Sequence, residues 1–273
     1  VISCLRASGV QCILHAAAYK HVTLVEDKEV ASLRNNVLGT RTLANAALQA
    51  ELEQFILIST DKAVRPTNVM GSSKRLAELV VQDFASRSGR TLFSMVRFGN
   101  VLGSSGSVIP LFQEQISRGG PVTLTHGDVT RYFMTISEAA RLVLIAGSFA
   151  AGGDVFVLDM GKPVKILDLA RSLIALSGRT VRDADNPAGD IEVKITGLRP
   201  GEKLYEELLI GDDILGTPHD KIFRAQESSL SELEVANAMR DLNKAIGEDD
   251  ATTARNVIQR WVDGYHQPIV DVV

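Results

Sequence analysis

Residues able to bind a ligand follow three predicted strands at the point where each strand ends. In chain order they are 15–18 (HAAA), 59–62 (STDK) and 97–100 (RFGN). In an open parallel sheet, ligands bind beyond the carboxyl ends of the strands. Any one of these groups is compatible with an ordinary surface turn, but three of them at one sheet edge predict a ligand site there.

A methionine and a lysine lie four residues apart where a helix is predicted to begin. Met70 and Lys74 therefore share one helix face, directed toward the strand end that bears Asp61. By itself, such a pair is typical of a core methionine and a solvated lysine. Its place opposite a polar strand end makes Lys74 a candidate site residue.

The elements that must position these groups alternate between strand and helix. Short apolar runs predict buried strands, and apolar residues at helical spacing predict helices. The strands are expected over 10–15, 55–58, 92–98 and 154–158, and the helices over 30–50, 71–88 and 137–149. This alternation builds a parallel sheet with right-handed crossovers. We therefore predict an α/β fold, a doubly wound parallel sheet of the Rossmann type.

The pattern becomes less regular after residue 103, which predicts a smaller α+β part. Helices are expected over 108–119, 166–177 and 202–209, short strands over 122–125 and 191–195, and a helical tail over 229–265. We place the boundary between two domains near residue 160, so that they comprise 1–159 and 160–273. Residues 105–127 are expected to contribute to the side of the second domain.

The composition excludes several classes of protein. With 33 acidic and 29 basic residues the net charge is −4, which gives no basic surplus for nucleic acid. The two cysteines, Cys4 and Cys12, form no CxxC pair and indicate a reducing compartment. No cluster of His, Cys and carboxylate residues has the spacing of metal ligands. The longest uncharged apolar run, 142–151, is too short to span a bilayer.

Several blocks of sequence resemble a known superfamily. The segments 15–22 (HAAAYKHV), 35–40 (NNVLGT), 57–78 (LISTDKAVRPTNVMGSSKRLAE) and 97–112 (RFGNVLGSSGSVIPLF) are similar to the extended short-chain dehydrogenase/reductases. Two more, 130–139 (TRYFMTISEA) and 197–208 (GLRPGEKLYEEL), narrow the resemblance to the CapD-like polysaccharide-biosynthesis proteins. Within these, the chain most resembles the large, membrane-anchored UDP-N-acetylglucosamine 4,6-dehydratases, which carry methionine at the usual tyrosine position.

The resemblance implies a lyase reaction on a nucleotide sugar with NAD as cofactor. Sugar C4 is oxidised, water is lost across C5 and C6, and hydride returns to C6, so that NAD is regenerated in each turnover. Lys62 is then the base at C5, Asp61 the acid that protonates the departing C6 hydroxyl, and Thr60 a holder of the C4 hydroxyl. An adjacent acid and base suit this elimination because both proton transfers occur on neighbouring carbons.

The same resemblance assigns roles to the pair on the helix. Lys74 contacts the nicotinamide ribose and supplies positive charge where the C4 alkoxide develops. Met70 stands where other members of the superfamily have a catalytic tyrosine, and a thioether cannot act as a base. Water or Lys74 must then take the C4 proton.

Further positions are expected to bind cofactor or substrate. The small residues Ala16, Ala17 and Ala18 let the cofactor approach the backbone, and Asn36 is expected to tie two strands together. Substrate contacts, with Arg preferred for diphosphate, are expected from Tyr19, Lys20, Asn100, Arg131, Arg199 and Glu202.

One element of the superfamily is missing. The Gly-x-Gly-x-x-Gly loop that cradles the NAD pyrophosphate is absent from this chain. We therefore expect a sheet that lacks its first strands, preceded in a longer parent by about 60 residues or more. The residues 1–159 are then the rest of an NAD-binding domain, and 160–273 bind the nucleotide sugar. The resemblance also implies a homo-oligomer, cytoplasmic, whose parent is anchored on the cytoplasmic face of the inner membrane.

Three functions remain open on the sequence. The first is a fragment of a UDP-N-acetylglucosamine 4,6-dehydratase. The second is a nucleotide-sugar 4-epimerase of the same superfamily, against which the triplet at residues 60–62 argues. The third is a non-catalytic remnant that binds nucleotide sugar but cannot hold NAD.

Overall fold

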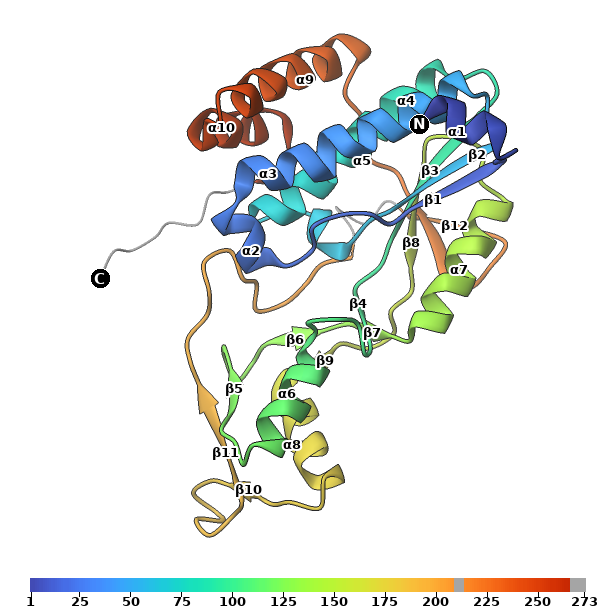
Figure 1. Ribbon diagram of the computed structural model, residues 1–273. Coiled ribbons are helices and arrows are strands. Elements are labelled where there is room, and N and C mark those ends of the chain that lie inside the picture. Colours follow the sequence, from blue (N-terminus) through green and yellow to red (C-terminus); the bar gives the residue numbers. More distant parts are fainter. Residues whose placement is uncertain (209–213, 266–273) are drawn as a thin grey trace. The chain divides into compact units, whose positions relative to one another are not determined.

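A six-stranded sheet in the order β1-β2-β3-β8-β13-β12 organises the larger part of the computed structural model, which describes residues 1–208 and 214–265 (Figure 1). The first four strands are parallel, β13 runs antiparallel to β8, and β12 runs antiparallel to β13. They are β1 (Cys12–His15), β2 (Gln54–Ile58), β3 (Leu92–Arg97), β8 (Asp154–Leu158), β13 (Ile222–Ala225) and β12 (Ile214–Gly216). The predicted Rossmann-type α/β fold is confirmed, with a mixed and mostly parallel sheet.

Helices pack on both faces of this sheet because successive strand residues point to opposite sides. Phe55 and Leu57 of β2 are fully buried in the core that the sheet shares with α4 (Gly39–Gln49) and α5 (Val69–Arg87). Ile56, between them, faces α7 (Ile136–Ser148) so closely that a Cβ on Gly147 would lie 2.5 Å from its Cδ1. The sheet is therefore doubly wound.

The predicted helix over 30–50 is one run of three segments. It consists of α3 (Glu29–Leu33), the π-helical η1 (Arg34–Leu38) and α4. The wide turn was not predicted. It holds Asn36, which is buried and whose carbonyl accepts a 2.7 Å hydrogen bond from the Thr40 hydroxyl. The short helices α1 (Ile2–Ala7) and α2 (Val22–Asp27) flank β1 in the sequence.

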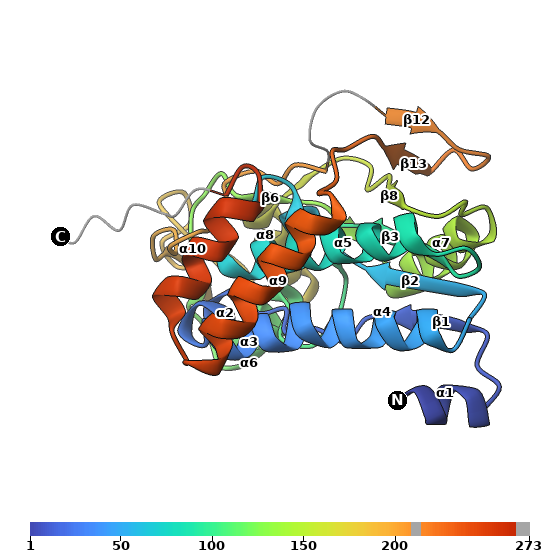
Figure 2. The same cartoon turned by 90° about the horizontal axis from the view of Figure 1, so that it is seen from above.

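The C-terminal tail is helical, as predicted, but broken into two helices. They are α9 (Glu232–Gly247) and α10 (Ala251–Trp261), and Figure 2 shows them lying across α3 and α5. Ser231 begins α9 with a capping box, and the Asp250 side chain accepts from the Thr253 backbone N–H to begin α10. Asp249 between them has a φ of 54°, which ends the first helix.

The chain divides into two compact units. The first comprises 1–98, 141–159 and 207–273, and the second comprises 99–140 and 160–206. The second has its own core around Phe112, Ile174 and Ile191. Its helices are α6 (Val108–Ser117) and α8 (Ile166–Leu176). Its three-stranded sheet has the order β10 (Val181–Arg182), β11 (Ile191–Ile195) and β5 (Val122–Leu124). Two short strand pairs complete it, β4 (Asn100–Val101) with β7 (Phe133–Met134) and β6 (Thr130–Arg131) with β9 (Val164–Lys165). The functional division at residue 160 stays a prediction.

The predicted helix over 202–209 is wrong for residues 202–208, which form turns and irregular backbone. Tertiary hydrogen bonds hold this segment, and one of them occupies a backbone carbonyl that a helix would use. The Leu204 carbonyl accepts from the Thr130 backbone N–H at 3.0 Å, and the Glu202 carboxylate accepts from the Thr125 hydroxyl at 2.8 Å. Residue 209 lies outside the described residues.

The start of α5 lies in direct contact with η2 (Asp61–Ala63). A Cβ on Gly71 would stand 2.1 Å from the carbonyl oxygen of Lys62, which is far inside contact distance. We expect Gly71→Ala to lower the free energy of unfolding by about 1–3 kcal/mol, as overpacking does, measured by urea denaturation. The matched control is Gly39→Ala on α4, where the nearest atom is 4.0 Å away and stability should hold or rise. Equal effects of the two substitutions would contradict the close contact.

Candidate active site

Thr60, Asp61 and Lys62 form a hydrogen-bonded group beyond the end of β2. Lys62 Nζ donates to Asp61 Oδ1 at 2.9 Å, and the Thr60 hydroxyl donates to the same oxygen at 2.9 Å. Asp61 is 1% exposed, whereas the Lys62 side chain is 18% exposed. The buried carboxylate is therefore held by its two neighbours, and the amine reaches the surface.

The second oxygen of the Asp61 carboxylate, Oδ2, is buried and has no hydrogen-bond partner among the described residues. The Asp61 backbone N–H donates to the Phe98 carbonyl at 3.1 Å, just past β3. A buried carboxylate oxygen without a donor is costly, which marks it for a ligand or a proton. The fold fixes this residue between the ends of two strands.

Lys74 lies against the last residue of β2. Its Nζ donates to the Ile58 carbonyl at 2.6 Å, and the residue is 7% exposed. Burial lowers the pKa of Lys74 to about 8, and the carboxylate of Glu78 one helical turn away opposes this effect. An ammonium group has three hydrogens, so two remain for ligand hydroxyls.

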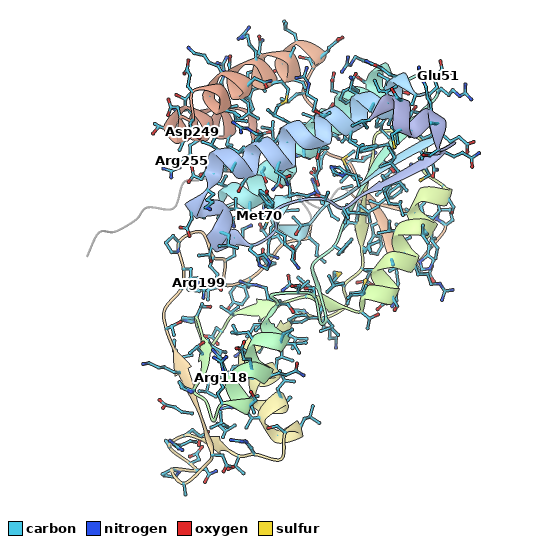
Figure 3. The ribbon with its side chains drawn as sticks, viewed as in Figure 1. Glu51, Met70, Arg118, Arg199, Asp249 and Arg255 are labelled. Carbon is cyan, nitrogen blue, oxygen red and sulfur yellow. The ribbon has the colours of Figure 1, made fainter. Side chains whose placement is uncertain are left out.

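Met70 is a core residue at the start of α5, where Figure 3 labels it. It is 4% exposed and belongs to the large core of the first unit. The helix begins at Asn68, whose side chain accepts from the Gly71 backbone N–H at 2.8 Å. The Ser73 hydroxyl donates to the Met70 carbonyl at 2.7 Å, which fixes the turn that precedes Lys74.

His15 at the end of β1 adds an uncharged group to the same region. Its Nε2 lies 2.9 Å from the Thr40 hydroxyl, and its ring is 5.8 Å from that of Phe55. Burial, and after it the charge of Lys74, lowers the pKa of His15 to about 4. The imidazole is therefore neutral at physiological pH and places no second positive charge beside Lys74.

Asn36 connects the loop after β1 to α5. Its side chain accepts from the Tyr19 backbone N–H at 2.7 Å and donates to the Tyr19 carbonyl at 3.0 Å and to the Ser73 hydroxyl at 2.9 Å. The expectation that it ties two strands is wrong, because one partner is a loop and the other a helix. The loop itself carries Ala16, Ala17, the half-buried Ala18, and the exposed Tyr19 and Lys20.

The structure also contains a buried charge cluster that the sequence analysis missed. Arg97, which ends β3, and Glu78 of α5 are both 0% exposed, and Arg97 Nε donates to Glu78 Oε1 at 2.8 Å. Arg75 and Glu227 complete the cluster of four charges. An arginine at the end of an otherwise apolar strand was the available signal, because such a charge is buried only when it is paired.

The remaining predicted residues come together in the second unit. Arg131 lies 3.5 Å from the Glu202 carboxylate and 3.6 Å from that of Glu206. Glu202 also accepts from the Arg199 backbone N–H at 3.2 Å, and the Asn100 backbone N–H donates to the Tyr132 carbonyl at 3.0 Å. Arg199 is exposed, whereas the Arg131 side chain is 10% exposed. The structure thus connects Glu202 to the Arg131 side chain and to the Arg199 backbone.

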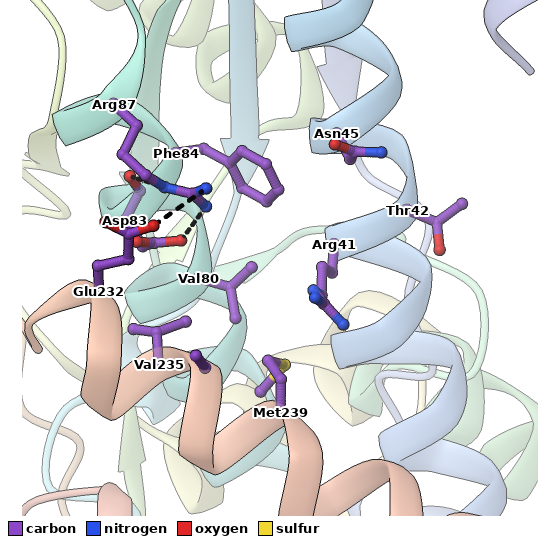
Figure 4. A pocket seen from close by; sticks show the side chains of 11 residues that line it. Arg41, Thr42, Asn45, Val80, Asp83, Phe84, Arg87, Glu232, Val235 and Met239 are labelled. Carbon is purple, nitrogen blue, oxygen red and sulfur yellow. Dashed lines mark hydrogen bonds and ion pairs between the residues drawn. The ribbon is translucent and has the colours of Figure 1, made fainter.

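A pocket of about 380 Å³ lies elsewhere in the first unit, between α4, α5 and α9 (Figure 4). Arg87 spans its wall, because it pairs with Asp83 and Glu232 and covers the ring of Phe84 at 5.0 Å. None of the predicted site residues lines this pocket.

Two features are absent from residues 1–208 and 214–265, the described part of the chain. Within them, no group of three or more His, Cys, Asp and Glu side chains is arranged to hold a metal ion. No helix in these ranges has the length and apolarity that crossing a membrane requires.

Comparison with known proteins settles the family. The sequence profile of the polysaccharide biosynthesis proteins matches residues 1–227. The chain belongs to this family. It is 54% identical over 231 residues to the capsular polysaccharide biosynthesis protein CapD of Staphylococcus aureus, and 54% identical over 202 residues to the probable polysaccharide biosynthesis protein EpsC of Bacillus subtilis.

These matches cover 84% and 74% of the chain but only 37% of CapD and 32% of EpsC. The chain thus spans about a third of the length of the first curated relatives it matches. It is also 38% identical over 208 residues to a UDP-glucose 4-epimerase of Rickettsia rickettsii, a match that covers 76% of the chain and 58% of the epimerase.

Solved structures show the same fold. Pen from Bacillus thuringiensis aligns with the chain at a TM-score of 0.72 and 29% identity, covering 88% of the chain and 78% of Pen. The dTDP-glucose 4,6-dehydratase DesIV of Streptomyces venezuelae, solved with NAD bound, aligns at a TM-score of 0.64 and 22% identity, covering 76% of the chain and 68% of DesIV.

Proposed function

We propose that this chain is the catalytic part of a nucleotide-sugar 4,6-dehydratase that converts UDP-N-acetylglucosamine to its 4-keto-6-deoxy derivative for polysaccharide biosynthesis. The observation that carries the proposal is the contact between Asp61 and Lys62, 2.9 Å apart beyond β2. An elimination needs an acid and a base on adjacent carbons, and these two side chains supply both.

The first unit has residues that fit the nicotinamide half of NAD. Ala16 and Ala17 follow β1 and are exposed, so that a flat ring can approach the backbone at the carboxyl end of a parallel strand. After its bond to Ile58, the neutral amine of Lys74 has one hydrogen left for a ribose hydroxyl and a lone pair that can accept a proton. NAD, when bound, supplies the acceptor of the C4 hydride and returns it to C6. The glycine-rich loop for the pyrophosphate is not in this chain.

Lys74 is the group that takes the C4 hydroxyl proton in this proposal. A buried lysine whose pKa is about 8 is partly neutral near physiological pH, which is the state in which it accepts a proton. The ammonium group that results stands where negative charge develops on the C4 oxygen. Lys74 then removes the proton that a tyrosine removes in other members of the superfamily, and Met70 is a packing residue.

Asp61 and Lys62 then work as a pair. At rest they form an ion pair, whereas the elimination needs a neutral amine and a protonated carboxyl group. Their 2.9 Å hydrogen bond lets one proton move from Lys62 to Asp61 without exchange with water. Lys62 removes the C5 proton, and Asp61 protonates the C6 hydroxyl as water leaves.

Arg131 and Arg199 are proposed to bind the diphosphate of the UDP-sugar, with Asn100 and Glu202 beside them. Guanidinium groups match phosphate oxygens with two parallel hydrogen bonds. Glu202 holds both arginines in the second unit, through the Arg131 side chain and the Arg199 backbone. Tyr19 and Lys20 are proposed to line the cofactor or sugar site in the first unit.

The experiment that tests the proposal is product identification with the full-length protein, NAD and UDP-N-acetylglucosamine. We expect a 4-keto-6-deoxy sugar, detected by NMR from a new methyl signal at C6. A 4-epimerase would return a sugar that keeps its C6 hydroxyl. The relative named as a UDP-glucose 4-epimerase, at 38% identity, supports that second candidate. A protein that binds the sugar and forms neither product would be the non-catalytic remnant.

The role of Met70 has a direct test in the same assay. Because the residue is packed in the core, we expect Met70→Leu to fold and stay active, since swaps of similar volume in cores usually cost less than about 1.5 kcal/mol of stability. Met70→Tyr should raise turnover and change the pH profile, because a titrating phenol then joins Lys74. An inactive Met70→Leu variant that is still folded would show that the thioether itself takes part.

A further inference from the structure

The buried charge cluster joins the tail of the first unit to the helix that carries Lys74. Glu227 lies two residues beyond β13, 130 positions after Arg97 in the sequence. Arg97 Nη2 donates to Glu227 Oε2 at 2.9 Å, and Arg75 Nη1 lies 2.9 Å from the same oxygen. The Glu227 side chain is 4% exposed, so this carboxylate is almost as buried as its partners.

The cluster contains two positive and two negative charges. Arg75 Nη1 also donates to Glu78 Oε2 at 3.1 Å, which makes a closed arrangement in which each arginine contacts both carboxylates. Burial alone would raise the pKa of Glu78, but Arg97 and Arg75 outweigh it and lower the pKa to about 2. Glu78 is thus charged at neutral pH, and the formal charges of the two arginines and two glutamates cancel.

Lys74 lies beside this cluster and is the residue to which we assign the role of base at C4. It precedes Arg75 in the sequence and lies one helical turn before Glu78, whose charge acts on it. The other titratable groups at Lys74 are His15 of β1, which is neutral, and the Asp61–Lys62 ion pair of η2, the segment that packs on α5. Neither adds net charge beside the amine.

We propose that Glu227 is a positioning residue for Lys74: it cancels the surplus positive charge of Arg75 and Arg97, and so sets the proton affinity of a lysine that it does not touch. The C-terminal segment after β13 is then part of the machinery that tunes the site, although it lies far from the site in the sequence. The catalytic importance of Lys74 rests on the proposed function, whereas the electrostatic effect of Glu227 on Lys74 does not.

Removal of one charge from the cluster should shift the pKa of Lys74, and the sign of the removed charge decides the direction of the shift. Glu227→Gln leaves the cluster at +1, which disfavours the ammonium form, so the pKa of Lys74 should fall. Arg75→Gln leaves the cluster at −1 and should raise it. A merely structural role predicts that both substitutions loosen the site, admit water and raise the pKa of Lys74 together.

The test measures the pH dependence of Lys74 modification by methyl acetimidate, with the modified residue identified by mass spectrometry. This reagent reacts with neutral amines, so the midpoint reports Lys74 directly and needs no turnover. We expect a midpoint near pH 8 in the unmodified protein, a lower one for Glu227→Gln and a higher one for Arg75→Gln. Exposed Lys194 is the internal reference and should not change.

Because loss of one partner of a buried pair destabilises a protein strongly, a second comparison keeps the test valid if Glu227→Gln does not fold. The double variant Arg75→Gln/Glu227→Gln has a neutral cluster and should return the midpoint to that of the parent. It differs from Arg75→Gln only by the charge of Glu227. A midpoint for Glu227→Gln equal to or above that of the parent, or equal midpoints for Arg75→Gln and the double variant, would overturn the inference. Shifted midpoints in a protein that forms no 4-keto-6-deoxy sugar would overturn the proposed function alone.

Discussion

Asp61→Asn should lower the rate of 4-keto-6-deoxy sugar formation by about 10²- to 10⁴-fold, the range over which a positioned acid accelerates a reaction. The amide cannot protonate the departing C6 hydroxyl, but it has nearly the same shape and still accepts hydrogen bonds from Thr60 and Lys62. Binding of the UDP-sugar should therefore be unchanged. The measurement is the initial rate by NMR, together with substrate affinity by calorimetry.

The matched control is Asp27→Asn, which changes an exposed carboxylate on α2 and should leave the rate unaltered. A second observation separates the two members of the pair. In deuterated water, recovered substrate of the Asp61→Asn variant should carry deuterium at C5 only where the solution is basic enough for solvent, instead of Asp61, to take the Lys62 proton. The Lys62→Met variant should show neither exchange nor product. Full activity of Asp61→Asn would remove the acid from the mechanism.

Lys74→Met should have the second large effect, a fall in turnover of about 10²- to 10⁴-fold, because it removes both the base at C4 and the positive charge beside the developing alkoxide. In the parent protein the rate should rise with pH up to about 8, since the neutral amine is the active form and the pKa of Lys74 is lowered to about 8. This acid limb is measured as kcat/KM from pH 6 to 9, because kcat/KM reports the pKa of the free enzyme.

Lys194→Met is the control for Lys74→Met, since it removes an exposed lysine from the second unit. A Lys74→Ala variant gives a further check, because a small amine such as methylamine should restore part of its turnover. If turnover in the parent instead falls as pH rises through 8, Lys74 acts as a cation only, and another group takes the C4 proton.

The sequence predicts the parallel core of the fold well, because the information there is local. The apolar runs at β2 and β3 lie within a residue or two of the observed strands, and the helical spacing after Asn68 gives α5. The strand ends could also be predicted to meet. Lys74 reaches the Ile58 carbonyl, and the Asp61 backbone N–H reaches that of Phe98, so these groups share one edge of the sheet.

Features that depend on distant parts of the chain could not be predicted. The pairing of β13 with β8 joins residues 222–225 to 155–158, and nothing in either segment indicates the other. Glu227 reads as an ordinary polar residue until Arg97 is seen 130 positions earlier. The irregular segment 202–208 has a helical pattern, but the Glu202 carboxylate accepts hydrogen bonds from Thr125 and Arg131, which lie far away in the sequence.

The most direct measurement of the central claim follows the hydrogen at C4. The full-length protein is incubated with UDP-N-acetylglucosamine that carries deuterium at C4, and the product is examined by NMR. A dehydratase that returns the hydride gives a 4-keto-6-deoxy sugar with deuterium at C6, and this is the result we predict. Deuterium found at C4 of the C4 epimer, with the C6 hydroxyl retained, would contradict it.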